Sequence, residues 1–436
     1  MTFPILGGNT GIAAYEIDNS LRFNDGDSAH LDNTFSSTTN RKTYSYSTWI
    51  KRSVLDGANQ HIFGVYIDSS NHSLFRFDSG EKLDIRNNLN TSVFQLDSDM
   101  VFRDTSAWYH ILIVTDTTES TASNRIKAYV NGTQITLSGS YPTLNKDTYI
   151  NDNRLHTIGE VSSGAEEFDG YMAETHFIDG SAKQPSDFGE FDSDSGIWKP
   201  IEYTGSYGTN GFYLKFSNSS DFGEDFSGNN NDFTASNLAS TDQTIDTPTN
   251  NWCTLNALDT PTSGSTFSEG NLKIDTNTSQ QGFTRSTFAV SQGKWYFEAK
   301  ITTSNVREAI GITLVNIGNF DLTGKVDYYS RYGHILKGNS LISTQATYGN
   351  NDRIGVAFNL DDNTVAFYKN GSLQDTVTSI DSGTYSPMYR DGSDAYTCGA
   401  IFNFGNNGSF AGTETAQGNA DGNGFGDFYY APPSGY

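Results

Sequence analysis

RIKAYVNGTQITL, residues 125–137, contains the clearest local fold signal in the chain. Two runs rich in β-branched and aromatic residues flank Asn131-Gly132, a pair that tolerates the positive φ values of a type I′ turn. Because alternate side chains of a strand point to opposite faces, the first run should bury one apolar face. The side chains expected on that face are Ile126, Ala128 and Val130. The stretch therefore predicts a β-hairpin.

The same signal recurs in the later half, where Asn370-Gly371 follows the strand-like run at 364–368. Other runs of strand length end at polar turns. They are 44–50, 61–67, 74–77, 108–114, 171–178, 211–216, 283–290, 294–301, 309–315, 353–360 and 398–404. Apolar residues show no sustained helical period, although residues 185–189 fit one helical turn. We therefore predict an all-β protein with two consecutive, jelly-roll-like β-sandwich domains.

Composition changes indicate the domain boundaries. Residues 1–19 and 411–436 are rich in Gly and Asn and lack a core pattern, so we expect an extended arm and tail. The two sandwiches are expected at 20–200 and 251–410. Residues 201–250, with polar turns and the hinge-like 247–251, are expected to connect them.

Charge and cysteine content restrict the function classes. The formal net charge of −24 argues against nucleic-acid binding, and no apolar run is long enough to span a membrane. The N-terminal residues lack the pattern of a secretory signal, so we expect folding in a cytosol. Cys253 and Cys398 could form a disulfide if the first and last strands of the second domain are neighbours, or be small buried hydrophobic residues.

Two sets of sequence motifs resemble those of known domain families. YSTWIKR (46–52), WYHI (108–111), AYVNG (128–132) and FDGYMAE (168–174) resemble the laminin-G/concanavalin A-like sandwich in order and spacing. GKWYFEA (293–299), IGI (310–312), DRIGVAF (352–358), VAFYKNG (365–371) and IFNF (401–404) resemble a SPRY domain. These resemblances imply a lectin-like domain followed by a SPRY-like domain.

The junction between the domains has a resemblance of its own. HFIDG (176–180), PSDFGE (185–190) and WKP (198–200) are similar to virion and tail-fibre proteins of marine phages. This resemblance implies a virion protein made in the host cytoplasm, which binds host glycans or neighbouring virion proteins through its termini or sandwich faces, within an oligomer or larger assembly. Two alternatives stay open: a ligand-free capsid or tail decoration protein, and a polysaccharide-degrading enzyme.

The candidate ligand site is a cluster of rings at 328–334. Sugars stack their apolar faces on aromatic rings and present hydroxyls to polar groups. The cluster consists of Tyr328, Tyr329, Tyr332 and His334. We expect these rings to form a platform on a loop, with packing inside the SPRY-like core as the alternative.

Calcium is the candidate cation, although no cofactor is required for folding. It prefers six to eight oxygen ligands, which Asp, Asn and turn carbonyls supply. Three loops have such oxygens, and hydrogen-bonded turns are the alternative for each. The acidic residues of these loops are Asp25, Asp27, Asp225, Asp232 and Asp421.

Catalysis is not expected. A glycoside hydrolase needs two carboxylates at a matched separation. The nearest pattern is Glu190-Phe191-Asp192-Ser193-Asp194, which follows a predicted helical turn instead of lying along an aromatic-rich strand. The His residues form no metal-ligand spacing, and no nucleophile motif is present.

Overall fold

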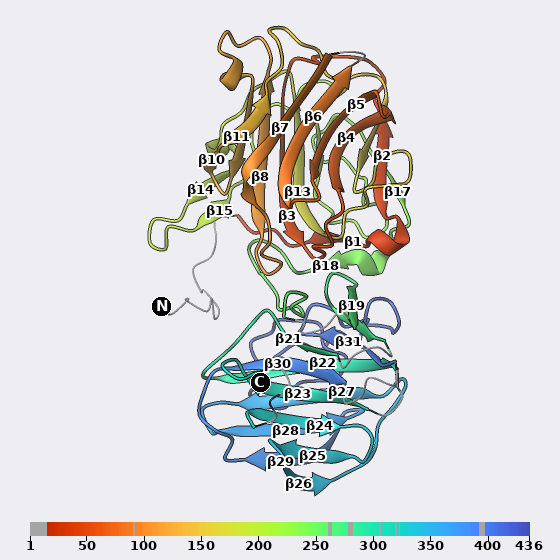
Figure 1. The fold of residues 1–436 in the computed structure, drawn as a ribbon, viewed down its shortest axis with the longest axis vertical. Coiled ribbons are helices and arrows are strands. Elements are labelled where there is room, and N and C mark those ends of the chain that lie inside the picture. The colour runs from red at the N-terminus through yellow and green to blue at the C-terminus, as the bar shows by residue number, and fades with distance from the viewer. Residues whose placement is uncertain are drawn as a thin grey trace. The chain divides into compact units, whose positions relative to one another are not determined.

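The structure is a computed structural model that describes residues 15–89, 92–259, 264–277, 282–304, 307–318, 321, 323–391 and 397–436. These residues form two compact units, 15–251 and 252–436, which we call the first and second units. Each contains two large antiparallel sheets (Figure 1). The predicted all-β class with two consecutive sandwiches is confirmed.

The first unit is built from two eight-stranded sheets within the described residues. The first sheet has the order β10-β9-β8-β3-β13-β1-β18, with β16 also paired to β13. Its strands are β1 (Ser20–Phe23), β3 (Thr43–Arg52), β8 (Tyr109–Asp116), β9 (Ile126–Val130), β10 (Thr133–Ile135), β13 (Gly170–Asp179), β16 (Phe212–Leu214) and β18 (Gln243–Thr244).

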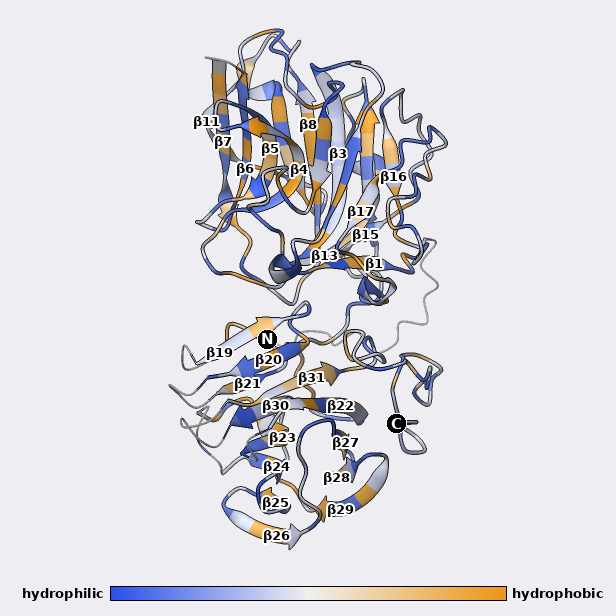
Figure 2. Cartoon of the chain, turned by 90° about the vertical axis from the view of Figure 1, so that its right-hand side faces the viewer, coloured by the Kyte–Doolittle hydropathy of each residue, from blue (hydrophilic) through white to orange (hydrophobic). Residues whose placement is uncertain are grey.

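The second sheet of this unit has the order β11-β7-β6-β5-β4-β12-β2-β17. Its strands are β2 (His30–Thr34), β4 (Gln60–Asp68), β5 (Asn71–Phe77), β6 (Lys82–Leu89), β7 (Ser92–Val101), β11 (Leu137–Ser140), β12 (Leu155–Ile158) and β17 (Thr234–Ser236). A separate hairpin joins β14 (Gly189–Phe191) to β15 (Trp198–Pro200). Hydrophobic and hydrophilic segments follow one another along β7 (Figure 2).

The predicted hairpin at 125–137 is confirmed. Val130 pairs with Thr133, and Asn131 and Gly132 adopt φ values of 47° and 75°. A Cβ on Gly132 would lie 2.4 Å from the Trp198 ring, so a close approach adds to the requirement for glycine. The predicted core face, Ile126, Ala128 and Val130, is buried in the main hydrophobic cluster.

Residues 201–250 do not merely connect the domains, because they complete the first unit. Within this segment β16 pairs with β13, β17 with β2, and β18 with β1. Tyr203 and Tyr207 pack on a cluster that includes Leu112 and Tyr129, on the face of the first sheet opposite the main core. The described part of the predicted arm also packs there, since Ile17 is buried beside Trp49. Both faces of the first sheet are therefore covered.

The second unit contains a seven-stranded and a six-stranded sheet within the described residues. The first has the order β19-β20-β31-β22-β27-β28-β29, and the second β21-β30-β23-β24-β25-β26. The strands are β19 (Ser265–Ser268), β20 (Lys273–Thr276), β21 (Phe283–Arg285), β22 (Lys294–Thr303), β23 (Glu308–Leu314), β24 (Lys325–Tyr329), β25 (His334–Lys337), β26 (Ser340–Thr344), β27 (Arg353–Asn359), β28 (Thr364–Lys369), β29 (Ser372–Thr378), β30 (Tyr385–Asp391) and β31 (Gly399–Asn403).

The second Asn-Gly turn is also confirmed. Lys369 pairs with Ser372 across Asn370 and Gly371, whose φ values are 50° and 77°. Cys253 and Cys398 are present as two buried thiols in the core of this unit. They pack as small hydrophobic residues, which was one of the two roles expected for them.

The tail at 411–436 is not a free extension, because it packs on the second unit. Glu298 of β22 is fully buried and accepts hydrogen bonds from the backbone N–H groups of Tyr429 and Tyr430, both at 2.8 Å. Asn403 Nδ2 and the Tyr296 hydroxyl donate to the same carboxylate at 3.1 Å. The composition of the tail could not show this, since the anchoring residue lies more than a hundred positions away.

Replacing Glu298 by alanine is expected to detach the tail and to lower the stability of the second unit by about 2–4 kcal/mol. The reason is that four hydrogen-bond donors lose the carboxylate that accepts from them. Limited proteolysis should then cut within 411–436 faster than in the unaltered chain. Asp375→Ala, on β29 at the sheet edge, is the matched control and should change neither quantity. Equal proteolysis of both variants would mean that Glu298 does not hold the tail.

Helical structure is confined to single turns in the described residues. They are η1 (Asp25–Asp27), η2 (Ala122–Asn124), η3 (Pro185–Asp187) and η4 (Ser240–Asp242). The turn predicted at 185–189 is thus confirmed. None of the described helices has the length and hydropathy needed to cross a membrane.

Candidate functional site

The predicted ring cluster lies on a hairpin of the second unit. Strands β24 and β25 are antiparallel, and Tyr329 pairs with His334 across the connection. Tyr332, in that connection, is 49% exposed. Its ring centroid lies 5.1 Å from that of His334 and 6.3 Å from that of Tyr329. We call Tyr329, Tyr332 and His334 the ring platform.

Two arginines accompany the ring platform. The Arg331 guanidinium lies 4.9 Å from the centroid of the Tyr332 ring, and that of Arg390 lies 5.3 Å from the Tyr329 ring. Arg390 also donates to both carboxylate oxygens of Asp327, at 2.9 and 3.1 Å. Because Asp327 is buried, this bidentate ion pair fixes Arg390 beneath Tyr329.

Tyr328 does not belong to the ring platform, and its prediction as a ligand residue is wrong. Its side chain is fully buried, its hydroxyl donates to the carbonyl of Ala346, and its ring packs against Tyr348 and Phe367. The physical reason is the two-residue period of a strand, which directs Tyr328 to the core and Tyr329 to the opposite face. The packing alternative holds for this residue alone.

The three acidic loops are hydrogen-bonded turns. Asp225 accepts from the backbone N–H groups of Tyr213, Ser227 and Asn231, while Asp232 accepts from the N–H of Asp225. Asp421 accepts from the N–H groups of Asn423 and Phe425.

In the remaining loop Asp25 accepts from the N–H of Gly26, and Asp27 accepts from the Asn24 amide. The described residues contain no group of three or more acidic, His or Cys side chains suited to a metal ion. Calcium binding stays a prediction, and the contacts present at these loops are those of the turn alternative.

Asp192, in the acidic stretch at 190–194, lacks the electrostatics of a general acid. Lys199 Nζ lies 3.2 Å from a Glu190 oxygen and 3.4 Å from an Asp192 oxygen. A hydrogen bond from the backbone N–H of Ser195 and, with a smaller effect, one from its hydroxyl hold the pKa of Asp192 at about 2. A carboxyl that donates a proton near neutral pH needs a raised pKa, whereas that of Asp192 is lowered.

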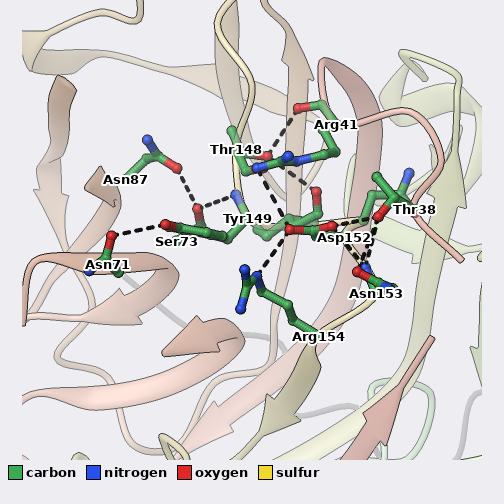
Figure 3. Close-up of polar contacts among 12 residues, drawn as sticks. Thr38, Arg41, Asn71, Ser73, Asn87, Thr148, Tyr149, Asp152, Asn153 and Arg154 are labelled. Atoms are coloured by element: carbon green, nitrogen blue, oxygen red, sulfur yellow. Dashed lines mark hydrogen bonds and ion pairs between the residues drawn. The ribbon is translucent and has the colours of Figure 1, made fainter. Parts of the chain in front are cut away.

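A second polar site, which the sequence did not reveal, lies in the first unit. Figure 3 shows Arg41 and Arg154 directed at the carboxylate of Asp152. One oxygen of Asp152 lies 3.8 Å from Arg41 Nη2 and 3.1 Å from Arg154 Nε, and the Thr38 hydroxyl donates to the other oxygen at 2.5 Å. Both guanidiniums lie within 6 Å of the centroid of the buried Tyr149 ring, at 5.8 and 5.4 Å.

A groove of about 450 Å³ adjoins this cluster. Its lining residues are Thr38, Thr39, Asn40, Arg41, Lys42 and Asp147. They come from two loops more than a hundred residues apart, so no local motif marks them. The only signal in the sequence was the adjacent pair Arg41-Lys42 in a strongly acidic chain.

Comparisons with known proteins agree with this architecture. Residues 23–185 match the model of the concanavalin A-like lectin/glucanases superfamily, and residues 294–392 match the model of the SPRY domain. The chain therefore contains a concanavalin A-like domain followed by a SPRY domain, both of which are binding or interaction folds. No curated protein matches the chain.

Solved structures similar to the chain share little sequence with it. The SPRY domain of human HERC1 is 14% identical, with 34% of this chain and 96% of that one covered and a TM-score of 0.31. The TRIM65 PSpry domain is 10% identical, with 34% and 91% covered and a TM-score of 0.30. Stonustoxin is 16% identical, with 35% and 27% covered and a TM-score of 0.30.

Proposed function

We propose that this chain, a concanavalin A-like domain followed by a SPRY domain, is a non-catalytic adhesion component of a virion surface that binds host glycans. The resemblance of residues 176–200 to phage virion and tail-fibre proteins supports the virion setting. The glycan-binding role rests on the ring platform.

The observation that carries this proposal is the exposure of Tyr332 next to His334 and Arg331. An exposed ring offers an apolar face to a sugar, and a guanidinium beside it donates hydrogen bonds to sugar hydroxyls. Tyr329 and His334 lie on paired backbone, and Tyr332 lies in the short connection between them, so little conformational entropy is lost on binding. Many copies on one particle would add avidity to weak single contacts.

Replacing Tyr332 by alanine is expected to weaken glycan binding about tenfold or more, because stacking on a ring is lost without loss of core packing. A glycan array identifies the bound saccharide, and calorimetry with that saccharide measures the change. The melting temperature should stay the same, since Tyr332 is half exposed.

Phe425→Ala is the matched control, because this ring is 60% exposed in the same unit and lies outside the ring platform. It should leave the affinity unchanged. Two results would contradict the proposal: retention of full affinity by the Tyr332 variant, or no saccharide bound by the unaltered chain. The second result is the one expected of a ligand-free decoration protein.

A further inference from the structure

We propose that the groove beside Arg41 and Lys42 is a separate binding site for anionic saccharides, meaning sugars that carry a carboxylate or a sulfate. The site lies in the first unit and is independent of the ring platform. It is open to solvent and has a volume of about 450 Å³.

The lining chemistry favours a sugar. All six lining residues are polar, and they include the hydroxyls of Thr38 and Thr39, the amide of Asn40 and the carboxylate of Asp147. Hydroxyls and amides both donate and accept hydrogen bonds, as sugar hydroxyls do, and a carboxylate accepts from neighbouring hydroxyls.

The charge of the groove favours an anion. Three charged side chains line the groove, the cations Arg41 and Lys42 and the carboxylate of Asp147. Behind them Asp152 pairs with Arg41, and Arg154 pairs with Asp152. Cations outnumber carboxylates in this group, whereas the whole chain has 27 Lys and Arg against 51 Asp and Glu. Within the described part of the chain, Lys42 Nζ pairs with Asp147 at 4.0 Å, and 38% of its side chain is exposed, so its donors remain accessible to a ligand.

The groove is also held in place before any ligand binds. Thr39 N donates to the carbonyl of Asn151, and Thr148 N donates to that of Arg41, both at 3.1 Å. Arg41 Nε donates in turn to the carbonyl of Thr148 at 2.5 Å. Asn40 Oδ1 accepts from the N–H groups of Lys42 and Thr43 at 3.0 and 2.9 Å. A site fixed in this way loses little conformational entropy on binding.

The test uses the full chain with three probes: an oligogalacturonide, a sulfated galactan oligosaccharide and an uncharged galactan oligosaccharide of the same length. Calorimetry should detect binding of at least one anionic probe, weakened by high salt because the contact is charged. Lys42→Glu should reduce that affinity by about tenfold or more, since an attractive charge becomes a repulsive one.

Arg103→Glu is the matched control. It makes the same change of charge at an exposed residue. Arg103 follows Phe102, whose carbonyl accepts a hydrogen bond from Arg52 at the end of β3, whereas Lys42 directly precedes the start of that strand. It should leave the affinity within about twofold, because distant exposed charges are screened. An equal loss in both variants would overturn the proposal, since net charge alone would then explain the binding.

Two further results would overturn it: no binding of either anionic probe, or equal affinity for the uncharged probe. The Tyr332→Ala variant separates this site from the ring platform. If the groove binds the anionic probe, this variant keeps full affinity. Loss of anionic binding in the Tyr332 variant, with retention in the Lys42 variant, would place the acidic sugar on the ring platform and end the groove proposal.

Discussion

Asp246→Ala is expected to destabilise the first unit by about 3–5 kcal/mol, because it removes one partner of a buried ion pair. Lys51 Nζ lies 2.7 Å from an Asp246 oxygen, and the two side chains are 1% and 0% exposed. The other oxygen accepts from Trp108 Nε1 at 3.0 Å. Without the carboxylate, the buried Lys51 ammonium loses its ionic partner, although it still donates to the Asn251 amide oxygen at 2.8 Å.

Chemical denaturation followed by tryptophan fluorescence measures this loss. Asp194→Ala removes an exposed carboxylate from the same unit and should change the free energy of unfolding by no more than about 1 kcal/mol. The double variant Lys51→Met, Asp246→Leu should recover much of the loss, because no buried charge is left unpaired. Equal effects of the two single carboxylate variants would mean that the pair contributes nothing.

Acidification to pH of about 4 is expected to unfold the first unit before the second, because three neutral histidines are buried in the first unit. Burial lowers the pKa of His61 and of His156 to about 4, and that of His110 to about 3. Each folded-state pKa lies below the ordinary value of 6.5, so the unfolded chain binds these protons first. Stability is therefore full above pH 6.5 and is lost as the pH falls toward the folded-state values.

The size of the effect follows from linkage. Each unit of pKa corresponds to about 1.4 kcal/mol, so each of these histidines removes on the order of 3 kcal/mol over this range. Burial raises the pKa of Asp84 and of Asp169, and these two carboxyls act in the opposite direction and offset part of the loss. The second unit contains a single histidine, His334, which lies at the surface of a hairpin.

Hydrogen exchange with peptide-level mass spectrometry, carried out over a series of pH values, follows both units in one experiment. His156→Gln is the informative variant, because His156 Nε2 accepts from the N–H of Asn151 only while the ring is neutral, with Nδ1 donating to the carbonyl of Arg154. The variant should be less stable at neutral pH and should lose less stability on acidification. If both units exchange together at every pH, the buried histidines do not control acid stability.

Features that depend on neighbouring residues could be predicted from the sequence. The Asn-Gly turns at 131 and 370 follow from local φ preferences, and the strands around them follow from alternation over several residues. The cluster at 328–334 was found from its ring content. The rings of this cluster do not all lie on one face, because the alternation of side chains along β24 directs Tyr328 to the core and Tyr329 to the opposite face.

Features that depend on distant partners could not be predicted. Strands β16 and β17 have three residues each, which is too short for a period to be visible, and only their pairing with β13 and β2 defines them. The buried charges of Lys51 and Asp246 are separated by 195 positions. The groove combines loops around Arg41 and Asp147, and the tail is held by Glu298 from a strand more than a hundred residues earlier.

The proposed function requires that the two β-sandwich units bind saccharides without altering them. The most direct test exposes a panel of neutral and anionic polysaccharides to the full chain, then measures both the protein retained and the chain length of each polymer afterwards. We expect retention on at least one saccharide, with polymer length unchanged. Retention on none of them, or shortening of the polymer that is bound, would contradict it.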